Sequence, residues 1–278
     1  MPEGPEVACV RDALSQVLTN KHVVLFEHTP HRFYKGIDQL ESDIHNEDIT
    51  IKEVSCYGKK LMIEFSNDKI LFNSLGRFGN WSIDKKPSTT RLTFGIGTKK
   101  QYDNFDQVTI VQYVYYGDTK GEGRFEYTKS KNKKVTLSKI GPDVLQDHLS
   151  LDDFYDLFQF KPKNQIIDAL LDQSIISGIG NYLRTDICYH AKLHPYRTVD
   201  SLSDDEWAVL HNSVYHICEK AYKKSGCTLG TFVTPNREKG TYVRLIDPKK
   251  SKTKNGESYV EGYCKSKRKI YWVPKLQK

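Results

Sequence analysis

Residues 170–184 read LLDQSIISGIGNYLR, in which an apolar stretch leads into two closely spaced glycines and then into a second apolar pattern. This order predicts a helix, a glycine-rich hairpin and a second helix. Glycines at 178 and 180 would let backbone amides approach a phosphate, and the N-terminus of the second helix favours an anion. A glycine turn that only packs two helices together gives the same pattern, so both interpretations stay open.

The sequence around this hairpin and beyond it keeps helical periodicity. Candidate helices span residues 151–158, 165–174, 181–191 and 204–223. The last of them begins with a capping box from Ser203 to Glu206, with acidic residues in its first turn. After Gly226 the chain returns to turns and short strands, and residues 270–273 are expected to form a final strand.

The pattern is different toward the N-terminus. One amphipathic helix is predicted from residue 5 to about residue 20, because Val7, Val10 and Leu14 recur at helical spacing. Runs rich in β-branched and aromatic residues follow at 22–27, 49–56, 61–65, 70–75, 91–96 and 108–116. Since these strands come before any second helix, we expect a β-sandwich in this half of the chain.

Together these segments predict a multi-domain α+β fold. We place an N-terminal β-sandwich domain at 1–138 and a linker, marked by Gly141-Pro142-Asp143, at 139–149. A helical domain that contains the glycine hairpin is expected at 150–240, and a terminal β-hairpin at 241–278.

The net charge of +7 is concentrated in one segment. Residues 249–278 contain ten Lys or Arg and two Glu, so this segment carries +8 and the rest of the chain −1. Such a patch suits contact with phosphates, although charge alone is also compatible with a solvated basic tail. Tyr259, Tyr263, Tyr271 and Trp272 argue against a disordered tail, because such tails contain few aromatic residues.

The composition argues against several classes of protein. No apolar run approaches the ~20 residues that span a bilayer, and the first residues do not form a secretory signal. The six cysteines include no C-x-x-C pair, so neither a zinc site on paired cysteines nor a disulfide framework is expected. We therefore expect reduced thiols, no metal ion, no cofactor and no membrane partner.

The first six residues, Met-Pro-Glu-Gly-Pro-Glu, are compatible with catalysis. Removal of Met1 would leave Pro2 as a secondary amine, and an α-amine titrates near pH ~8, so part of it is neutral at physiological pH. Attack of this amine on a sugar C1′ would give an iminium ion. Glu3 and Glu6 could move the protons. Ordinary capping of a helix by acidic residues would explain the same sequence.

This start resembles that of the Fpg/Nei DNA glycosylases, and glycine at position 4 is similar to the Nei (endonuclease VIII) branch. The resemblance implies that Pro2 is the nucleophile, that Glu3 is the acid/base catalyst and that Glu6 supports the site. Residues 57–62, YGKKLM, resemble the family's strand that carries a catalytic lysine after glycine, which implies this role for Lys59.

Residues 170–184 resemble the family's helix–two-turn–helix (H2TH) signature. The resemblance implies that Asn181, next to Gly180, hydrogen-bonds a DNA phosphate and that Lys163 makes another phosphate contact. Residues 267–272, KRKIYW, resemble the family's finger, in which Arg268 would bind phosphates around the flipped nucleotide.

The four zinc-binding cysteines of the common finger are absent. The chain is in this respect similar to the zincless-finger subgroup of vertebrates, plants and giant DNA viruses. The hairpin would then be held by packing of Tyr263, Tyr271 and Trp272 instead of by a metal ion.

Members of this family fill the gap left by the extruded base with side chains from two loops. Arg77 or Phe78 in the first loop, and Arg124 or Phe125 in the second, are the candidates that the resemblance gives. Strand-turn residues that never touch DNA are the other interpretation. Residues 236–242 lie where the family has a loop over the extruded base.

The resemblance implies a bifunctional DNA glycosylase and lyase that removes oxidised pyrimidines and hydantoins through a Schiff base at Pro2, with β- and then δ-elimination. Its partner would be damaged double-stranded DNA, or single-stranded DNA, bound by a monomer inside the cell. A non-enzymatic protein that binds damaged or abasic DNA with the same fold is the rival hypothesis. A ribosomal or topoisomerase-like H2TH module would not explain the first six residues.

Overall fold

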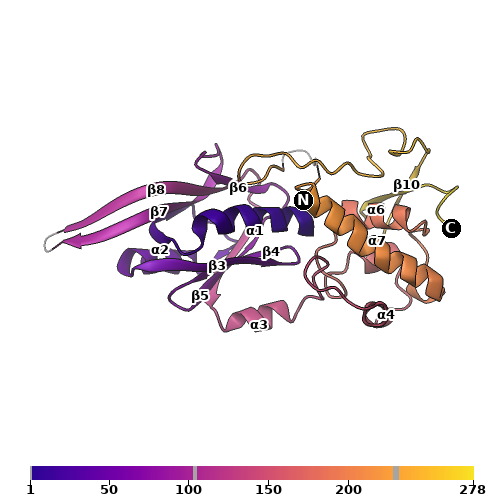
Figure 1. Cartoon of the computed structure of the whole chain (residues 1–278), viewed down its shortest axis with the longest axis horizontal. Coiled ribbons are helices and arrows are strands. Elements are labelled where there is room, and N and C mark those ends of the chain that lie inside the picture. The colour runs from indigo at the N-terminus through magenta and orange to yellow at the C-terminus, as the bar shows by residue number, and fades with distance from the viewer. Residues whose placement is uncertain (1, 103–104, 228–231) are drawn as a thin grey trace. The chain divides into compact units, whose positions relative to one another are not determined.

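The computed structural model of the chain describes residues 2–102, 105–227 and 232–278 (Figure 1). The chain forms two compact units. The first contains Pro2, residues 6–138 and residues 232–240. The second contains Glu3–Pro5, Lys139–Cys227 and Thr241–Lys278. Residues 232–240 thus belong to the first unit, although the sequence had placed them at the end of the helical domain.

The first unit is built on one large, mostly antiparallel sheet. Its order is β2-β9-β5-β4-β3-β1-β7-β8-β6, and only the β2–β9 pair is parallel. The strands are β1 His22–His28, β2 Tyr34–Lys35, β3 Ile49–Tyr57, β4 Lys60–Phe65, β5 Lys69–Ser74, β6 Gly79–Ile83, β7 Thr90–Tyr102, β8 Phe105–Asp118 and β9 Arg124–Lys129. Figure 1 shows β7 and β8 as a long hairpin that extends from the rest of the sheet.

The two halves of this sheet face each other across a common core, which is the arrangement expected of a β-sandwich. The indole N–H of Trp81 on β6 donates to the side-chain oxygen of Asn73 on β5 over 3.0 Å. The rings of Tyr116 on β8 and Phe125 on β9 lie 4.8 Å apart, edge to face. Strands far apart in the order of the sheet therefore meet in its interior.

Three helices accompany the sheet in the described part of the chain. α1, Gly4–Leu18, was predicted from its apolar spacing, and Val7, Val10 and Leu14 are buried. α2, Ile37–Asn46, and α3, Asn132–Leu137, were missed. Because α2 precedes β3, the expectation that all strands come before a second helix was wrong.

The second unit is mainly helical. It contains α4 Leu151–Gln159, α5 Ile166–Ala169, α6 Asn181–His190, the short 3₁₀ helix η1 Val199–Ser201, α7 Asp204–Lys223, and the strands β10 Val260–Tyr263 and β11 Lys269–Trp272. The capping box at Ser203 and Glu206 is present, as predicted. No helix in the described ranges is both long and apolar enough to cross a bilayer.

α5 is much shorter than the helix predicted over 165–174. Beyond Ala169, the amides of Leu171 and Asp172 bond to carbonyls three residues back, which is the tighter 3₁₀ pattern. The carboxylate of Asp172 then accepts the Ser174 amide over 3.0 Å, and this local bond competes with helix propagation.

Candidate active site and nucleic-acid interface

Glu3 is held at the N-terminus of α6, within the second unit. Its side chain is 3% exposed, and its two carboxylate oxygens accept the backbone N–H groups of Tyr182 and Leu183 at 3.0 and 3.2 Å. These amides belong to the first turn of α6, where no carbonyl of the helix can accept them. The positive end of the helix dipole favours the charged form of the carboxylate.

Gly180 makes room for this carboxylate. A Cβ atom at position 180 would lie 2.1 Å from the carboxyl carbon of Glu3, much closer than any real contact. The amide of Gly4 also donates to the carbonyl of Gly178 over 2.8 Å, which fixes the N-terminal segment against the hairpin. Gly178 and Gly180 thus contact the N-terminal segment of the same chain: one accepts its hydrogen bond and the other leaves room for its carboxylate.

The anion at the N-terminus of α6 is therefore the carboxylate of Glu3. The sequence had suggested that amides of this hairpin approach a phosphate, but those of Tyr182 and Leu183 already have an acceptor. Gly180 makes room for Glu3 in the structure, and the DNA contact predicted at Gly180 stays a prediction.

The other N-terminal candidates lie in the first unit. Pro2 is buried, and Glu6, in the first turn of α1, is fully buried. Lys59 is the second residue of a two-residue turn that joins β3 to β4, rather than a residue within a strand. Gly58 occupies the first position of this turn with φ +58°, as a type II′ hairpin requires. The turn leaves Lys59 half-buried at the end of the hairpin.

Asn181 is fixed by a buried arginine. The side chain of Arg184 is fully buried; one terminal nitrogen donates to the Ile167 carbonyl over 3.0 Å, and the other to the Asn181 side-chain oxygen over 2.7 Å. The Asn181 amide nitrogen in turn donates to the Lys269 carbonyl of β11 over 3.4 Å. Both ends of the Asn181 amide are thus oriented.

Arg184 also reaches the turn between β10 and β11, where it contacts the Cys264 sulfur at 3.3 Å. The arginine therefore connects α5, α6 and this turn. Sequence reasoning missed it, although a charged residue among the apolar positions of α6 was a visible signal. Its contacts depend on residues far away in the sequence.

The turn between β10 and β11 presents Arg268. The amide of Cys264 donates to the Arg268 carbonyl over 3.1 Å, and Lys267 has a left-handed backbone with φ +57°. The Arg268 side chain is exposed. Hydrogen bonds from Ser266 and from Arg184 outweigh the effect of burial and lower the pKa of the Cys264 thiol.

Aromatic packing around this hairpin differs in part from the expectation. The rings of Tyr196 and His194 lie 5.3 and 5.4 Å from that of Trp272, and Tyr271 packs against Tyr259 at 5.6 Å. Tyr263, in contrast, is 59% exposed, so its predicted packing role was wrong. The residues present do not suit a structural zinc ion, because no cluster of three or more His, Cys, Asp or Glu occurs in the described parts of the chain.

Lys163 lies on the surface of the second unit. Its side chain is 86% exposed and forms an ion pair with Asp200. An exposed pair of this kind is weak, so the ammonium group can exchange its carboxylate partner for a phosphate.

The two loops that were expected to fill the gap in DNA meet within the first unit. Arg77 is exposed and hydrogen-bonds to Glu122. Its Nε lies 2.8 Å from one carboxylate oxygen of Glu122 and 3.1 Å from the other. This hydrogen-bonded contact lowers the pKa of Glu122. Phe78, next to Arg77, is 37% exposed.

The position of Phe125 does not fit its predicted role, which was to fill the gap left by the extruded base. It is 1% exposed and packs in the core against Tyr116, so it could reach DNA only by leaving the core. Arg124 lies on the opposite face of β9, with its guanidinium 4.9 Å from the ring of Phe33. Alternation along a strand explains why two neighbouring candidates point to opposite faces.

Hydrogen bonds to one buried carboxylate hold the turn that carries Glu122, residues 118–123. Asp118 is fully buried, and its carboxylate accepts the amides of Lys120 and Gly121 at 3.0 Å each and that of Gly123 at 2.7 Å. One side chain thus organises the whole turn. Arg77 consequently has a fixed partner, although Arg77 itself is exposed.

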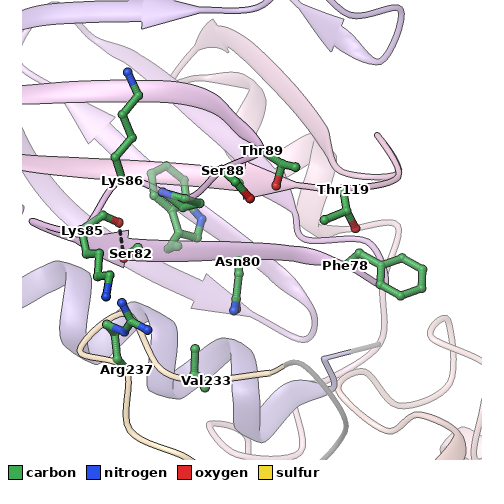
Figure 2. Close-up of a pocket in the computed structure, with 13 residues that line it drawn as sticks. Phe78, Asn80, Ser82, Lys85, Lys86, Ser88, Thr89, Thr119, Val233 and Arg237 are labelled. Carbon is green, nitrogen blue, oxygen red and sulfur yellow. Dashed lines mark hydrogen bonds between the residues drawn. The ribbon is translucent and has the colours of Figure 1, made fainter.

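A cavity of about 380 Å³ lies between β6, the loop that follows it and residues 232–240 of the first unit. The amide of Ile83 donates to the Pro235 carbonyl over 3.1 Å, which attaches this segment to the edge of the sheet. Figure 2 shows Lys85 and Arg237 on the same side of the cavity, whereas the ring of Phe78 points away from the other labelled side chains.

Comparison with known proteins places the chain in a family. The sequence model of the formamidopyrimidine-DNA glycosylase N-terminal domain matches residues 1–110, and that of the formamidopyrimidine-DNA glycosylase H2TH domain matches residues 140–233. The formamidopyrimidine-DNA glycosylase of Lactiplantibacillus plantarum is 29% identical over 245 residues, which are 87% of this chain and 85% of that protein. Endonuclease 8 of Pectobacterium carotovorum subsp. carotovorum is 26% identical over 294 residues and is matched over 100% of both chains.

The fold agrees with these matches. A crystal structure of the wild-type Lactococcus lactis Fpg protein in complex with DNA that contains an oxidised pyrimidine superposes with a TM-score of 0.83 and 22% identity, over 100% of both chains. The chain therefore belongs to the Fpg/Nei (endonuclease VIII) family, as its motifs predicted. It is a DNA glycosylase of base excision repair.

Proposed function

We propose that the protein is a bifunctional DNA glycosylase and abasic-site lyase in which Pro2 is the nucleophile. The observation that carries this proposal is the buried Glu3 carboxylate, fixed by two amides of α6 and admitted by Gly180. Glu3 directly follows Pro2, so a fixed Glu3 also restricts where the neighbouring amine can lie. Burying a carboxylate costs free energy, and a protein that only binds DNA would not need to bury one at this position.

In the proposed reaction the lone pair of the Pro2 nitrogen attacks C1′ of the damaged nucleotide, and the bond from C1′ to the base breaks. The base leaves with a proton, and Glu3 is the group that we assign to proton transfer. The bound amine loses its proton, and the C1′–O4′ bond of the sugar opens as O4′ takes up a proton, which leaves an iminium ion at C1′. This iminium ion acidifies the C2′ proton. Its removal expels the 3′ phosphate by β-elimination, and a second elimination expels the 5′ phosphate. Glu6 supports the site, and Lys59 stabilises charge on the sugar and phosphate.

DNA would be held by phosphate contacts from Asn181, Arg268 and Lys163. The orientation of the Asn181 amide by Arg184 supports the first contact, and the exposed position of Arg268 in its turn supports the second. Such contacts position the duplex without reading its sequence. Arg77 is the side chain that we assign to the gap left by the extruded base, because it is exposed and Phe125 is not.

The cavity beside residues 232–240 is our candidate for the extruded base. Its volume of about 380 Å³ falls in the range of small-ligand sites, and Asn80 and Arg237 supply polar groups to it. Oxidised pyrimidines and hydantoins in double-stranded DNA are the substrates that we propose. The glycine at position 4, which is typical of the Nei branch, and the oxidised pyrimidine in the DNA of the Lactococcus lactis complex support this class. A monomer with a zincless finger is part of the same proposal.

Borohydride trapping tests the proposed chemistry. The protein, shown by mass spectrometry to lack Met1, would be incubated with duplexes that carry one thymine glycol or one abasic site. We expect a covalent adduct with both, and its loss in Pro2→Gly. With Glu3→Gln we expect excision of thymine glycol to fall by at least ~100-fold, the smallest effect typical of acid/base catalysis. A processed protein that binds both duplexes but never forms an adduct would instead be a damage-binding protein.

The base cavity is tested separately, because an abasic site has no base to accommodate. Val233→Trp and Arg237→Ala should slow excision of thymine glycol and leave trapping on abasic DNA unchanged. Lys52→Ala is the control, since it removes a cation from an exposed site of the same unit that does not line the cavity. Equal losses on both substrates would show that the cavity does not hold the base.

A further inference from the structure

A second cavity, of about 270 Å³, opens on the outer face of the half-sheet formed by β2, β9, β5 and β4. It belongs to the first unit and is separate from the cavity beside residues 232–240. Its lining includes three cations, Lys35, Lys60 and Arg124, one carboxylate, Glu126, and the rings of Phe33 and Phe72. The formal charge of this lining is therefore +2.

Strand register explains why these side chains share one face. Ser74 on β5 pairs with Arg124 on β9, and Lys35 on β2 pairs with Glu126 on β9. Lys60 opens β4, whose next residue pairs with Asn73. Because successive side chains alternate between the faces of a sheet, Lys60 lies on the same face as Ser74 and Arg124.

None of the three cations forms an ion pair with a carboxylate of the described residues, although the charge of Glu126 acts to raise the pKa of the Lys60 ammonium. In the parts of the chain that the structure describes, no carboxylate oxygen lies within 4.0 Å of the charged nitrogens of Lys35, Lys60 or Arg124. Other lysines of the same unit do have one: Lys69 pairs with Asp43, and Lys133 lies 2.5 Å from Glu64. The three cations of the cavity thus differ from Lys69 and Lys133, which have carboxylate partners.

Partial burial of the charged Lys60 side chain costs free energy, because the ammonium has no ion-pair partner among the described residues. Lys60 is only half-exposed, its ammonium lies 5.6 Å from the centre of the Phe72 ring, and burial lowers the pKa of this ammonium. An anion that entered the cavity would neutralise the charge and offset this cost. The Arg124 guanidinium stacks on Phe33 at 4.9 Å, which orients its donors in advance.

We propose that this cavity binds a phosphate group, held by Lys35, Lys60 and Arg124, and that the backbone of the bound DNA supplies it. The identity of the DNA as ligand rests on the proposed function. The cavity adjoins two segments already assigned to DNA and a third that contacts one of them: Lys60 follows Lys59, Ser74 leads into the loop of Arg77, and Arg124 follows the turn of Glu122, the partner of Arg77. A strand that contacts these segments would bring its phosphates to the cavity.

Salt dependence of DNA binding tests the proposal directly. Affinity for a duplex with an abasic-site analogue would be measured over a range of salt concentrations for the parent protein, Lys60→Gln, Lys60→Arg and Lys21→Gln. One lost phosphate contact lowers the slope of log affinity against log salt by about 0.9. We expect this change in Lys60→Gln and not in Lys60→Arg. Lys21→Gln removes the same charge from an exposed site outside the cavity and should keep the parent slope.

Two further measurements separate the possible outcomes. Inorganic phosphate would be titrated into the DNA-free protein while the lysine ammonium signals are followed by NMR. A Lys60 response to phosphate together with an unchanged DNA slope in Lys60→Gln would mean that the cavity takes free anions, and would overturn the DNA assignment. No response and no change in slope would overturn the site itself.

Borohydride trapping at saturating DNA keeps this result apart from the proposed chemistry. Lys60→Gln should trap as well as the parent protein, because the cavity only positions the strand. If the parent protein never traps but the slope still changes in Lys60→Gln, the phosphate site stands and the lyase proposal fails. If Lys60→Gln alone loses trapping at saturation, the side chain acts in the reaction and the positioning role is wrong.

Discussion

Two segments that we assign to DNA are held in opposite ways. In the second unit, Asn181 is oriented by the fully buried Arg184, which also contacts the turn that presents Arg268. In the first unit, Arg77 is held by an exposed ion pair with Glu122. Buried charge contacts are expensive to break, whereas exposed pairs exchange easily with water and salt. The first segment should be preformed, and the second should rearrange when DNA arrives.

The largest effect is expected for Arg184→Met. Removing one partner from a buried charged network typically costs about 3–5 kcal/mol, because the remaining polar groups lose their bonds. Unfolding by urea should show this loss, and DNA affinity should fall with it. Arg184→Lys keeps the charge but cannot make the forked contacts to Ile167, Asn181 and Cys264, so it should be nearly as harmful. A fully stable Arg184→Met protein would contradict the account of a preformed segment.

Gly180→Ala should be the next most severe change. The added methyl group would occupy the place of the Glu3 carboxyl group, 2.1 Å from its carbon, and would displace it from the amides of α6. We expect base excision to slow by about 100-fold, which corresponds to the loss of a positioned acid/base group. Single-turnover kinetics would measure this, with circular dichroism to confirm the fold. Parent-like excision by a folded Gly180→Ala protein would mean that the Glu3 position is not needed.

Asp118→Asn tests the rigid turn behind Arg77. An amide in place of the carboxylate loses an acceptor for the turn and puts a donor against the N–H groups of Lys120, Gly121 or Gly123. A buried donor left without a partner costs about 1–3 kcal/mol. Thermal unfolding should show a destabilisation of this size. An unchanged melting temperature would show that the turn does not depend on Asp118.

The smallest effect on stability is expected for Glu122→Gln, because the contact with Arg77 is exposed. Its effect on DNA should be opposite in sign to that of Arg184→Met: without the carboxylate Arg77 is free for DNA, and a negative charge near phosphates is removed. We expect tighter binding by a few-fold at low salt, and no such gain when Arg77→Ala is present as well. Weaker binding in Glu122→Gln would mean that the pair positions Arg77 for DNA instead of restraining it.

The sequence predicted the segments whose signals are local. Helix α7 was found with its bounds because Ser203 and Glu206 form a capping box within four residues. α2 was missed, although Ile37, Leu40 and Ile44 repeat at helical spacing. The strand alternation of Arg124, Phe125 and Glu126 was also visible, and it would have shown that Phe125 faces the core.

The geometry of the proposed catalytic site could not be predicted in the same way. Glu3 and Tyr182 are 179 residues apart, and no periodicity connects them. The sequence of the Gly-rich hairpin indicated a phosphate site, because glycines and a helix N-terminus favour any anion. Only the structure identifies that anion as a carboxylate of the same chain. Resemblance to a family supplied the role proposed for Glu3, whereas the reason for Gly180 came from packing.

The most direct test of the central claim is to locate the covalent bond in the trapped complex. The borohydride-reduced adduct with abasic DNA would be digested and its peptides sequenced by mass spectrometry. We predict that the sugar fragment is attached to the nitrogen of Pro2, in a peptide that begins at Pro2. Attachment to Lys59, or to any other lysine, would contradict the account.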